Sequence, residues 1–121
     1  MQIKFTVNGK VPIATSRDIG YAEKAHLQVY TTKLCNVEIF DVDIIEYLSE
    51  CSKKHNRYVN CTIEILEKTP IENTESIAKQ FFQHLVDYYY EIFYEITKIE
   101  FTLTDSAGKE FHRTYFKGDI I

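Results

Sequence analysis

The sequence predicts an α+β protein in which a four-stranded antiparallel sheet carries two helices packed on one face. Segments in which apolar and polar residues alternate, as in half-buried strands, occur towards both ends of the chain. Between them lie two segments whose apolar residues recur every three or four positions, as in amphipathic helices. The expected order is strand, strand, helix, helix, strand, strand (ββααββ), and covering one sheet face with both helices is the simplest packing.

The first half of the sheet is expected to contain two strands. Residues 2–7 alternate, and the Asn8-Gly9 pair that follows predicts a tight turn because both residue types tolerate positive φ. Residues 14–24 lack periodicity and are expected to form a loop. The alternating segment 25–34 is expected to be the second strand.

The first helix is expected to begin after Asp41, a residue type favoured at helix N-caps. Its apolar stripe would consist of Ile44, Ile45, Leu48 and Cys51. The run KKHNRYVN (residues 53–60) would end this helix, because basic side chains favour a helix C-terminus and Asn tolerates the left-handed position that follows. The same run offers chemistry, since the imidazole of His55 titrates near neutral pH and is the best candidate for a general base.

The second half of the chain is more regular. Residues 61–67 suit a short strand or an extended connection, and Asn73 or Thr74 would cap a long helix. The apolar stripe of this helix would consist of Ile77, Phe81, Leu85, Tyr88 or Tyr89, and Ile92. Residues 99–104 and 110–116 are expected to be paired strands joined by the turn DSAGK at 105–109.

Composition limits the classes of function. A chain of 121 residues predicts one domain, 1–121. The net charge of -4, with no basic cluster longer than a pair, argues against nucleic acid as a partner. No apolar run approaches the ~20 residues of a membrane span, and no signal peptide is recognisable. Three cysteines without C-x-x-C spacing suggest free thiols in the cytoplasm. The close spacing of Tyr88, Tyr89, Tyr90 and Tyr94 suggests that some of them contact another subunit or another element of the chain.

Four strings carry a family resemblance: IFDVDIIEYLSE (39–50), RYVN (57–60), NTESIA (73–78) and FTLTDS (101–106). Their order and spacing resemble the 6-pyruvoyltetrahydropterin synthase and 6-carboxytetrahydropterin synthase family, which is built on the tunnelling fold (T-fold). The resemblance covers roughly residues 3 to 116, nearly the whole chain.

The resemblance implies a lyase of the tetrahydrobiopterin or queuosine pathway whose subunits, as a trimer or hexamer, close their sheets into a barrel. A pterin- or purine-like ligand would bind at a subunit interface. Asp105 would replace the family's pterin-anchoring Glu and accept bidentate hydrogen bonds, while Thr74 and Glu75 match the family's string at the start of the second helix.

The family's catalytic positions are not matched. Its first zinc-binding His would fall near Asn8 or Gly9, its His-Gly-His on Lys24-Ala25-His26, and its catalytic Cys near Gly20. His26 is the only possible surviving ligand, whereas catalytic zinc takes three protein ligands, so neither zinc nor another cofactor is expected.

A lyase of this kind would therefore be metal-independent. His55 would be its base, and Lys24 or Arg57 would supply positive charge to a substrate oxygen.

Each of these residues also has a structural interpretation. Asp105 suits the first position of a type I turn, and Glu75 and Thr74 suit a helix N-terminus. His84 and His112 are expected to be structural or interfacial residues, and His26 a surface or interface residue. The alternative function is that of a catalytically inactive homologue that acts as an assembly or protein-interaction scaffold.

Overall fold

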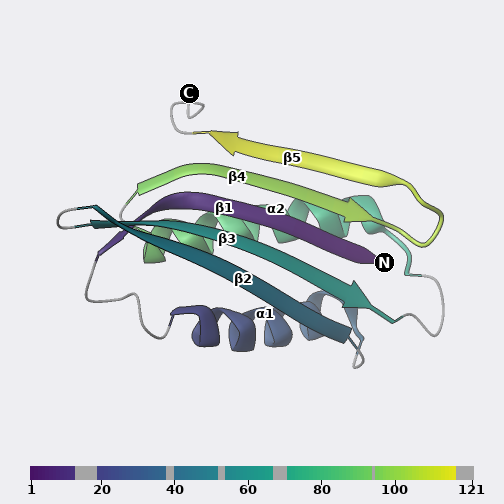
Figure 1. Ribbon diagram of the computed structural model, residues 1–121. Coiled ribbons are helices and arrows are strands. Elements are labelled where there is room, and N and C mark those ends of the chain that lie inside the picture. Colours follow the sequence, from purple (N-terminus) through teal and green to yellow (C-terminus); the bar gives the residue numbers. More distant parts are fainter. Residues whose placement is uncertain (13–18, 38–39, 52–53, 67–70, 94, 117–121) are drawn as a thin grey trace.

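The structure is a computed structural model that describes residues 1–12, 19–37, 40–51, 54–66, 71–93 and 95–116, with the backbone alone described for residues 11, 12, 19–22, 40–51 and 54–56. The elements in these residues are β1 (Gln2–Pro12), α1 (Ile19–Cys35), β2 (Phe40–Cys51), β3 (Lys54–Ile65), α2 (Thr74–Ile92), β4 (Glu95–Thr104) and β5 (Glu110–Phe116) (Figure 1).

The described strands form one antiparallel sheet in the order β2-β3-β1-β4-β5. β1 pairs with β3 on one side and with β4 on the other. Each helix therefore connects two strands that have a third strand between them. This is the β-α-β-β-α-β arrangement of ferredoxin-like folds, extended here by β5 at one edge.

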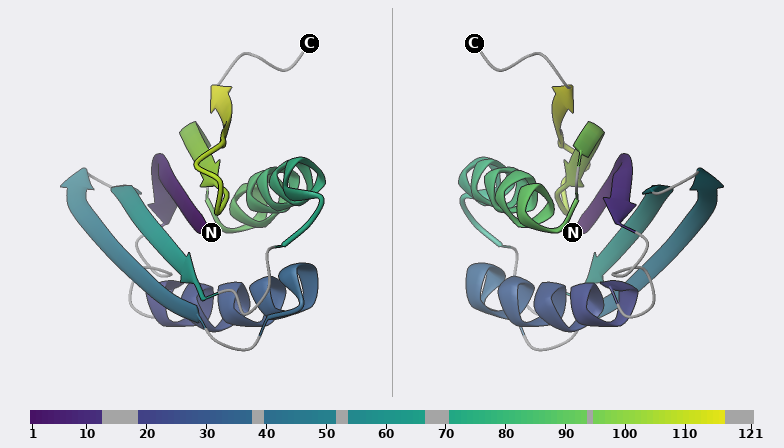
Figure 2. Two further views of the ribbon diagram at one scale, coloured as in Figure 1. Left: turned by 90° about the vertical axis from the view of Figure 1, so that its right-hand side faces the viewer. Right: turned by 90° about the vertical axis from the view of Figure 1, so that its left-hand side faces the viewer.

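One face of the sheet carries the apolar core, because alternate side chains of a strand point to the same face. The central strands bury Ile3, Phe5 and Val7 from β1, Val59, Cys61 and Ile63 from β3, and Ile99, Phe101 and Leu103 from β4. Both helices pack on this face, and the sheet curves around them (Figure 2). The prediction of an α+β protein with two helices on one face of an antiparallel sheet is thus confirmed.

Helix α2 was also predicted correctly. It follows Asn73, which adopts the left-handed conformation (φ 58°) and whose carbonyl accepts a 3.0 Å hydrogen bond from the Ile77 N–H. Its buried stripe consists of Ile77, Ala78, Phe81, Leu85 and Tyr89. The centre of the Phe81 ring lies 5.8 Å from the centre of the Phe101 ring, so the middle of the helix packs against β4.

Residues 25–34 were expected to form a strand and residues 14–24 a loop, and both predictions are wrong where the structure describes these residues. Residues 19–35 are helical, and residues 13–18 lie outside the described part. The inner face of α1 consists of Glu23, Leu27, Thr31 and Cys35, spaced four residues apart. Because two of these four are polar, the helix has no continuous apolar stripe, and the alternation around Leu27 and Val29 suggests a strand instead.

The prediction of a helix after Asp41 is wrong, because residues 40–51 form strand β2. The order along the chain is therefore βαββαββ, and the described strands number five rather than four. β2 pairs with β3 along its whole length, from Phe40 opposite Ile65 to Cys51 opposite Lys54. The helical spacing of Ile44 and Ile45 is overridden by this ladder, in which β-branched residues are favoured. Residues 54–60 therefore begin β3 instead of ending a helix, and the expected strand at 61–67 continues β3 as far as residue 65.

The remaining local predictions have mixed outcomes. β4, β5 and the turn between them are confirmed, with Gly108 at φ 85° and its N–H bonded to the Asp105 carbonyl at 3.0 Å. Asn8-Gly9 does not form a turn but lies inside β1, where the register with β4 shifts. A Cβ at Gly9 would overlap the carbonyl oxygen of Glu95 and the ring of Phe93, so glycine is required there by close packing.

We expect Gly9→Ala to lower the free energy of unfolding by about 1–3 kcal/mol, the usual cost of overpacking, because the neighbouring Glu95 carbonyl is main chain and cannot rotate away. Asn8→Ala is the matched control at the exposed neighbouring position and should change stability by less than about 0.5 kcal/mol. Urea titration measures both. Equal stabilities for the two variants would contradict the packing account of Gly9.

Candidate functional site

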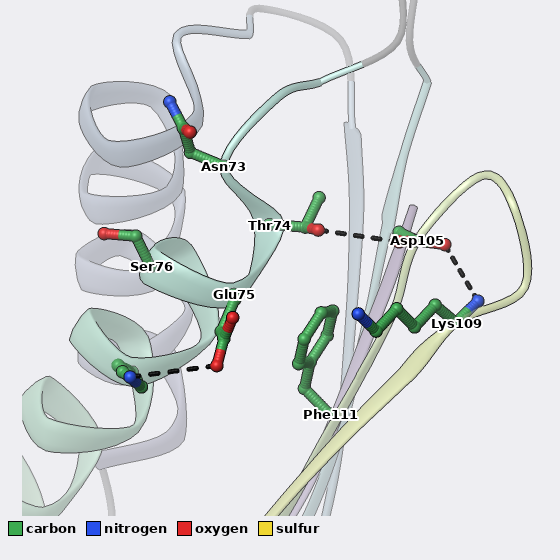
Figure 3. Close-up of a pocket in the computed structure, with 8 residues that line it drawn as sticks. Asn73, Thr74, Glu75, Ser76, Asp105, Lys109 and Phe111 are labelled. Atoms are coloured by element: carbon green, nitrogen blue, oxygen red, sulfur yellow. Dashed lines mark hydrogen bonds and ion pairs between the residues drawn. The ribbon is translucent and has the colours of Figure 1, made fainter.

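A polar hollow of about 530 Å³ lies where α2 begins and β4 turns into β5 (Figure 3). Its lining residues are Asn73, Thr74, Glu75, Ser76, Lys79, Asp105, Lys109 and Phe111. Two segments about thirty positions apart in the chain supply these residues, the first turns of α2 and the β4–β5 hairpin. All three residues predicted to bind substrate, Thr74, Glu75 and Asp105, are among them.

Asp105 performs two tasks with its two carboxylate oxygens. Its Oδ1 accepts hydrogen bonds from the backbone N–H groups of Ala107 (3.0 Å) and Lys109 (2.8 Å), which fixes the hairpin turn. Its Oδ2 faces the hollow and accepts a long hydrogen bond of 3.5 Å from the Thr74 hydroxyl. An oxygen with two donors has no lone pair left for a ligand, so Oδ2 is the atom that can receive one.

The charged groups of the hollow balance only when all four are counted, two carboxylates against two lysines. Lys79 Nζ lies 3.8 Å from Glu75 Oε1, and both side chains are more than half exposed. Such a pair contributes only about 0.3–0.5 kcal/mol in water and opens readily. Lys109 Nζ lies 5.2 Å from the centre of the Phe111 ring, which is half-buried and supplies the aromatic surface of the hollow.

A buried polar network occupies the other end of the helix layer. Glu23 of α1 and Arg57 of β3 are fully buried and form an ion pair between Oε1 and Nη1. The hydroxyl of Tyr89, also fully buried, donates a 2.6 Å hydrogen bond to Glu23 Oε2. Burial, followed by the negative charge and hydrogen bond of Glu23, raises the pKa of Tyr89 well above its usual value. Arg57, predicted as an electrostatic aid to catalysis, is therefore engaged in an interior ion pair.

Lys24 and His55, the other predicted catalytic residues, lie towards the same end as Arg57. Lys24 is exposed on α1, next to Glu23. His55 stands near the start of β3, opposite Val11 of β1, and its side chain lies outside the described part of the structure. Arg57 is paired with Gly9, whereas the hollow lies beside Gln2 at the far end of β1. Seven residues of strand separate these ends by roughly 23 Å. One chain therefore does not bring the predicted catalytic residues close to the predicted substrate-binding residues.

The described histidines have partners that sequence reasoning missed. His26 Nε2 lies 2.6 Å from His84 Nε2 of α2. His112 contacts Thr102 and Glu110 on the exposed sheet face at 2.9 and 3.0 Å. Among the described residues there is no group of three or more His, Cys, Asp or Glu side chains placed to hold a metal ion.

Comparison with known proteins does not assign a family. No protein-family model, curated protein or solved structure matches this chain. In the described residues, no helix is both long and apolar enough to cross a membrane.

We expect Glu23→Ala to lower the free energy of unfolding by about 3–5 kcal/mol, because it removes the carboxylate that balances the buried charge of Arg57. The double variant Glu23→Leu with Arg57→Met should be less destabilised than Glu23→Ala, since it leaves no buried charge. Lys24→Ala, at the exposed neighbouring position, should stay within about 0.5 kcal/mol of the wild type. The network would have no such role if urea titration gave Glu23→Ala and Lys24→Ala equal stabilities.

Proposed function

We propose that this protein binds a small pterin- or purine-like ring in the hollow between α2 and the β4–β5 hairpin, with Asp105 as the anchor. The observation that carries the proposal is the convergence of Thr74, Glu75 and Asp105 on one hollow. These are the residues that the resemblance to pterin synthases singles out. The geometry modifies the contact, since Asp105 would hold the ring through Oδ2 alone while Oδ1 maintains the turn.

The other groups of the hollow suit the same class of ligand. An amino-substituted heterocycle presents N–H donors in its plane, and Asp105 and Glu75 supply carboxylate acceptors for charge-assisted hydrogen bonds. Phe111 offers a ring on which a flat ligand can stack. The volume of about 530 Å³ lies within the range typical of small-molecule sites.

A lyase step of the pterin-synthase type places a further demand on the assembly. Lys24 or His55 would have to come from a second chain, because in one chain they lie towards the opposite end of the sheet from Asp105. Arg57 could not take part, since it is fully buried in its ion pair with Glu23. Binding at an interface of a homo-oligomer would meet that demand. The primary proposal is therefore ligand binding, with catalysis conditional on assembly.

The second candidate is a scaffold that acts through assembly, and strand β5 is the observation that favours it. Among the strands that the structure describes, β5 pairs with β4 alone, so its other edge presents backbone groups that a further strand can pair with. Phe116, at the end of this strand, is 44% exposed. Light scattering distinguishes the candidates when combined with ligand titration: a scaffold forms a defined oligomer yet binds no ring compound.

We expect Asp105→Asn to weaken binding of neopterin or guanine about tenfold to hundredfold, because a hydrogen bond to a charged group contributes about 1.5–3 kcal/mol. The substitution tests the ligand-binding oxygen separately from the turn. The amide oxygen can keep the two turn bonds made by Oδ1, while an NH₂ group replaces the acceptor that faces Thr74. Isothermal titration calorimetry measures the affinity, and thermal unfolding checks that the turn is intact.

Glu91→Gln is the matched control for this experiment. It also removes one negative charge, from an exposed residue at the far end of α2, and should leave the affinity unchanged. Absence of binding of either compound to the wild-type protein would overturn the proposal, and so would equal affinities of wild type and Asp105→Asn.

A further inference from the structure

A pair of histidines connects the two helices outside the hollow and outside the buried network. His26 of α1 and His84 of α2 place their Nε2 atoms 2.6 Å apart. Their ring centres are 4.9 Å apart and their planes differ by 10°. This centre-to-centre separation is as large as a 2.6 Å nitrogen contact permits, so the rings lie edge to edge in nearly one plane. The two Nε2 atoms therefore point directly at each other.

Two tyrosines hold the imidazoles in this arrangement. Tyr30 of α1 stacks on His84 at 3.7 Å, and Tyr88 of α2 stacks on His26 at 4.3 Å. The hydroxyl of Tyr30 also donates to the backbone carbonyl of Gln80 at 3.2 Å. Each tyrosine thus covers the histidine of the other helix, and the four rings together form a seam between α1 and α2.

The short contact has room for one proton only. In the neutral pair, one ring carries its proton on Nε2 and donates to the bare Nε2 of the other ring, which is protonated on Nδ1. A first added proton binds Nδ1 of the donor ring, and the hydrogen bond persists with a charged donor. A second added proton must bind the acceptor Nε2, where it meets the hydrogen already there and a second positive charge.

We infer that His26 and His84 form a proton-sharing clasp that fastens α1 to α2 at neutral pH and opens when the pair takes up its second added proton. The in-line approach suits a proton better than a metal ion, which would need bonds of about 2.0–2.1 Å to each nitrogen. The clasp is thus a pH-sensitive device built into the helix layer, independent of ligand binding in the hollow.

The surroundings of the pair favour its neutral form. Burial lowers the pKa of His26, and burial followed by the charge of His26 lowers the pKa of His84. Asp87 opposes this by raising the pKa of His84. In the described residues the pair is faced by Tyr30 from α1 and by Tyr88 and Asp87 from α2. One step further out, Glu23 of α1 and Arg57 of β3 act on Tyr88, and Cys35 of α1 acts on Tyr30.

The direction of the pH effect follows from these lowered pKa values. An unfolded histidine has a pKa of about 6.5, so below that pH the unfolded chain binds more protons than the clasp does. The stabilisation is complete above about pH 6.5 and is lost as the pH falls below it. Because the two rings are coupled, they titrate in two steps that belong to the pair.

Hydrogen–deuterium exchange of the α1 amides at pH 7.5 and pH 5.0 tests the clasp, with wild type and His84→Gln compared at each pH. The Gln side chain can donate to His26 Nε2 but does not titrate as an imidazole does. We expect similar α1 exchange in the two proteins at pH 7.5, and at least tenfold faster exchange in the wild type at pH 5.0. His112→Gln, which changes an exposed histidine on the sheet, should behave as the wild type does at both pH values.

Histidine-selective ¹H–¹⁵N NMR of the wild-type protein gives a readout that needs no variant. We expect one ring to be protonated on Nε2 and the other on Nδ1 at pH 7.5, with two titration steps. Identical tautomers that titrate independently at or above pH 6.5 would overturn the inference. An α1 exchange ratio between wild type and His84→Gln that does not change with pH would overturn it as well.

Discussion

The buried ion pair between Glu23 and Arg57 is the interaction on which the packing of the helix layer depends. It joins α1 to β3, and the Tyr89 hydroxyl extends it to α2. Two charges removed from water are tolerated only where they compensate each other and are hydrogen-bonded. Helix α1 can therefore occupy only the position in which the carboxylate of Glu23 meets both partners, and this polar contact compensates for the short apolar stripe of α1.

This constraint explains which elements the sequence predicts and which it does not. Helix α2 and strand β4 follow from local patterns, because each has one apolar face and one polar face, and β5 follows from the turn signal at residues 105–109. Helix α1 does not, since Glu23 and Thr31 occupy its inner face and only the folded protein shows what they contact. The local spacing of apolar residues in β2 predicts a helix, because the ladder of β2 with β3 is a non-local interaction that local spacing does not reveal.

The candidate site was predicted in part. The resemblance singled out Thr74, Glu75 and Asp105, and the fold brings them together because the start of α2 and the β4–β5 turn lie at the same end of the sheet. Lys79, Lys109 and Phe111 were not singled out, since only tertiary packing places them around the hollow. The predicted catalytic residues lie towards the other end, a separation that follows from strand register.

The measurement that tests the proposed site most directly is a ¹H–¹⁵N NMR titration of the protein with neopterin. We expect shifts concentrated in two separate segments, residues 73–79 and 105–111, with the β1–β3 pairs around Gly9 and Arg57 unaffected. Shifts clustered instead around Glu23 and Arg57, along β2, or in residues 112–116 of β5 would contradict this site, and so would a spectrum that neopterin does not change.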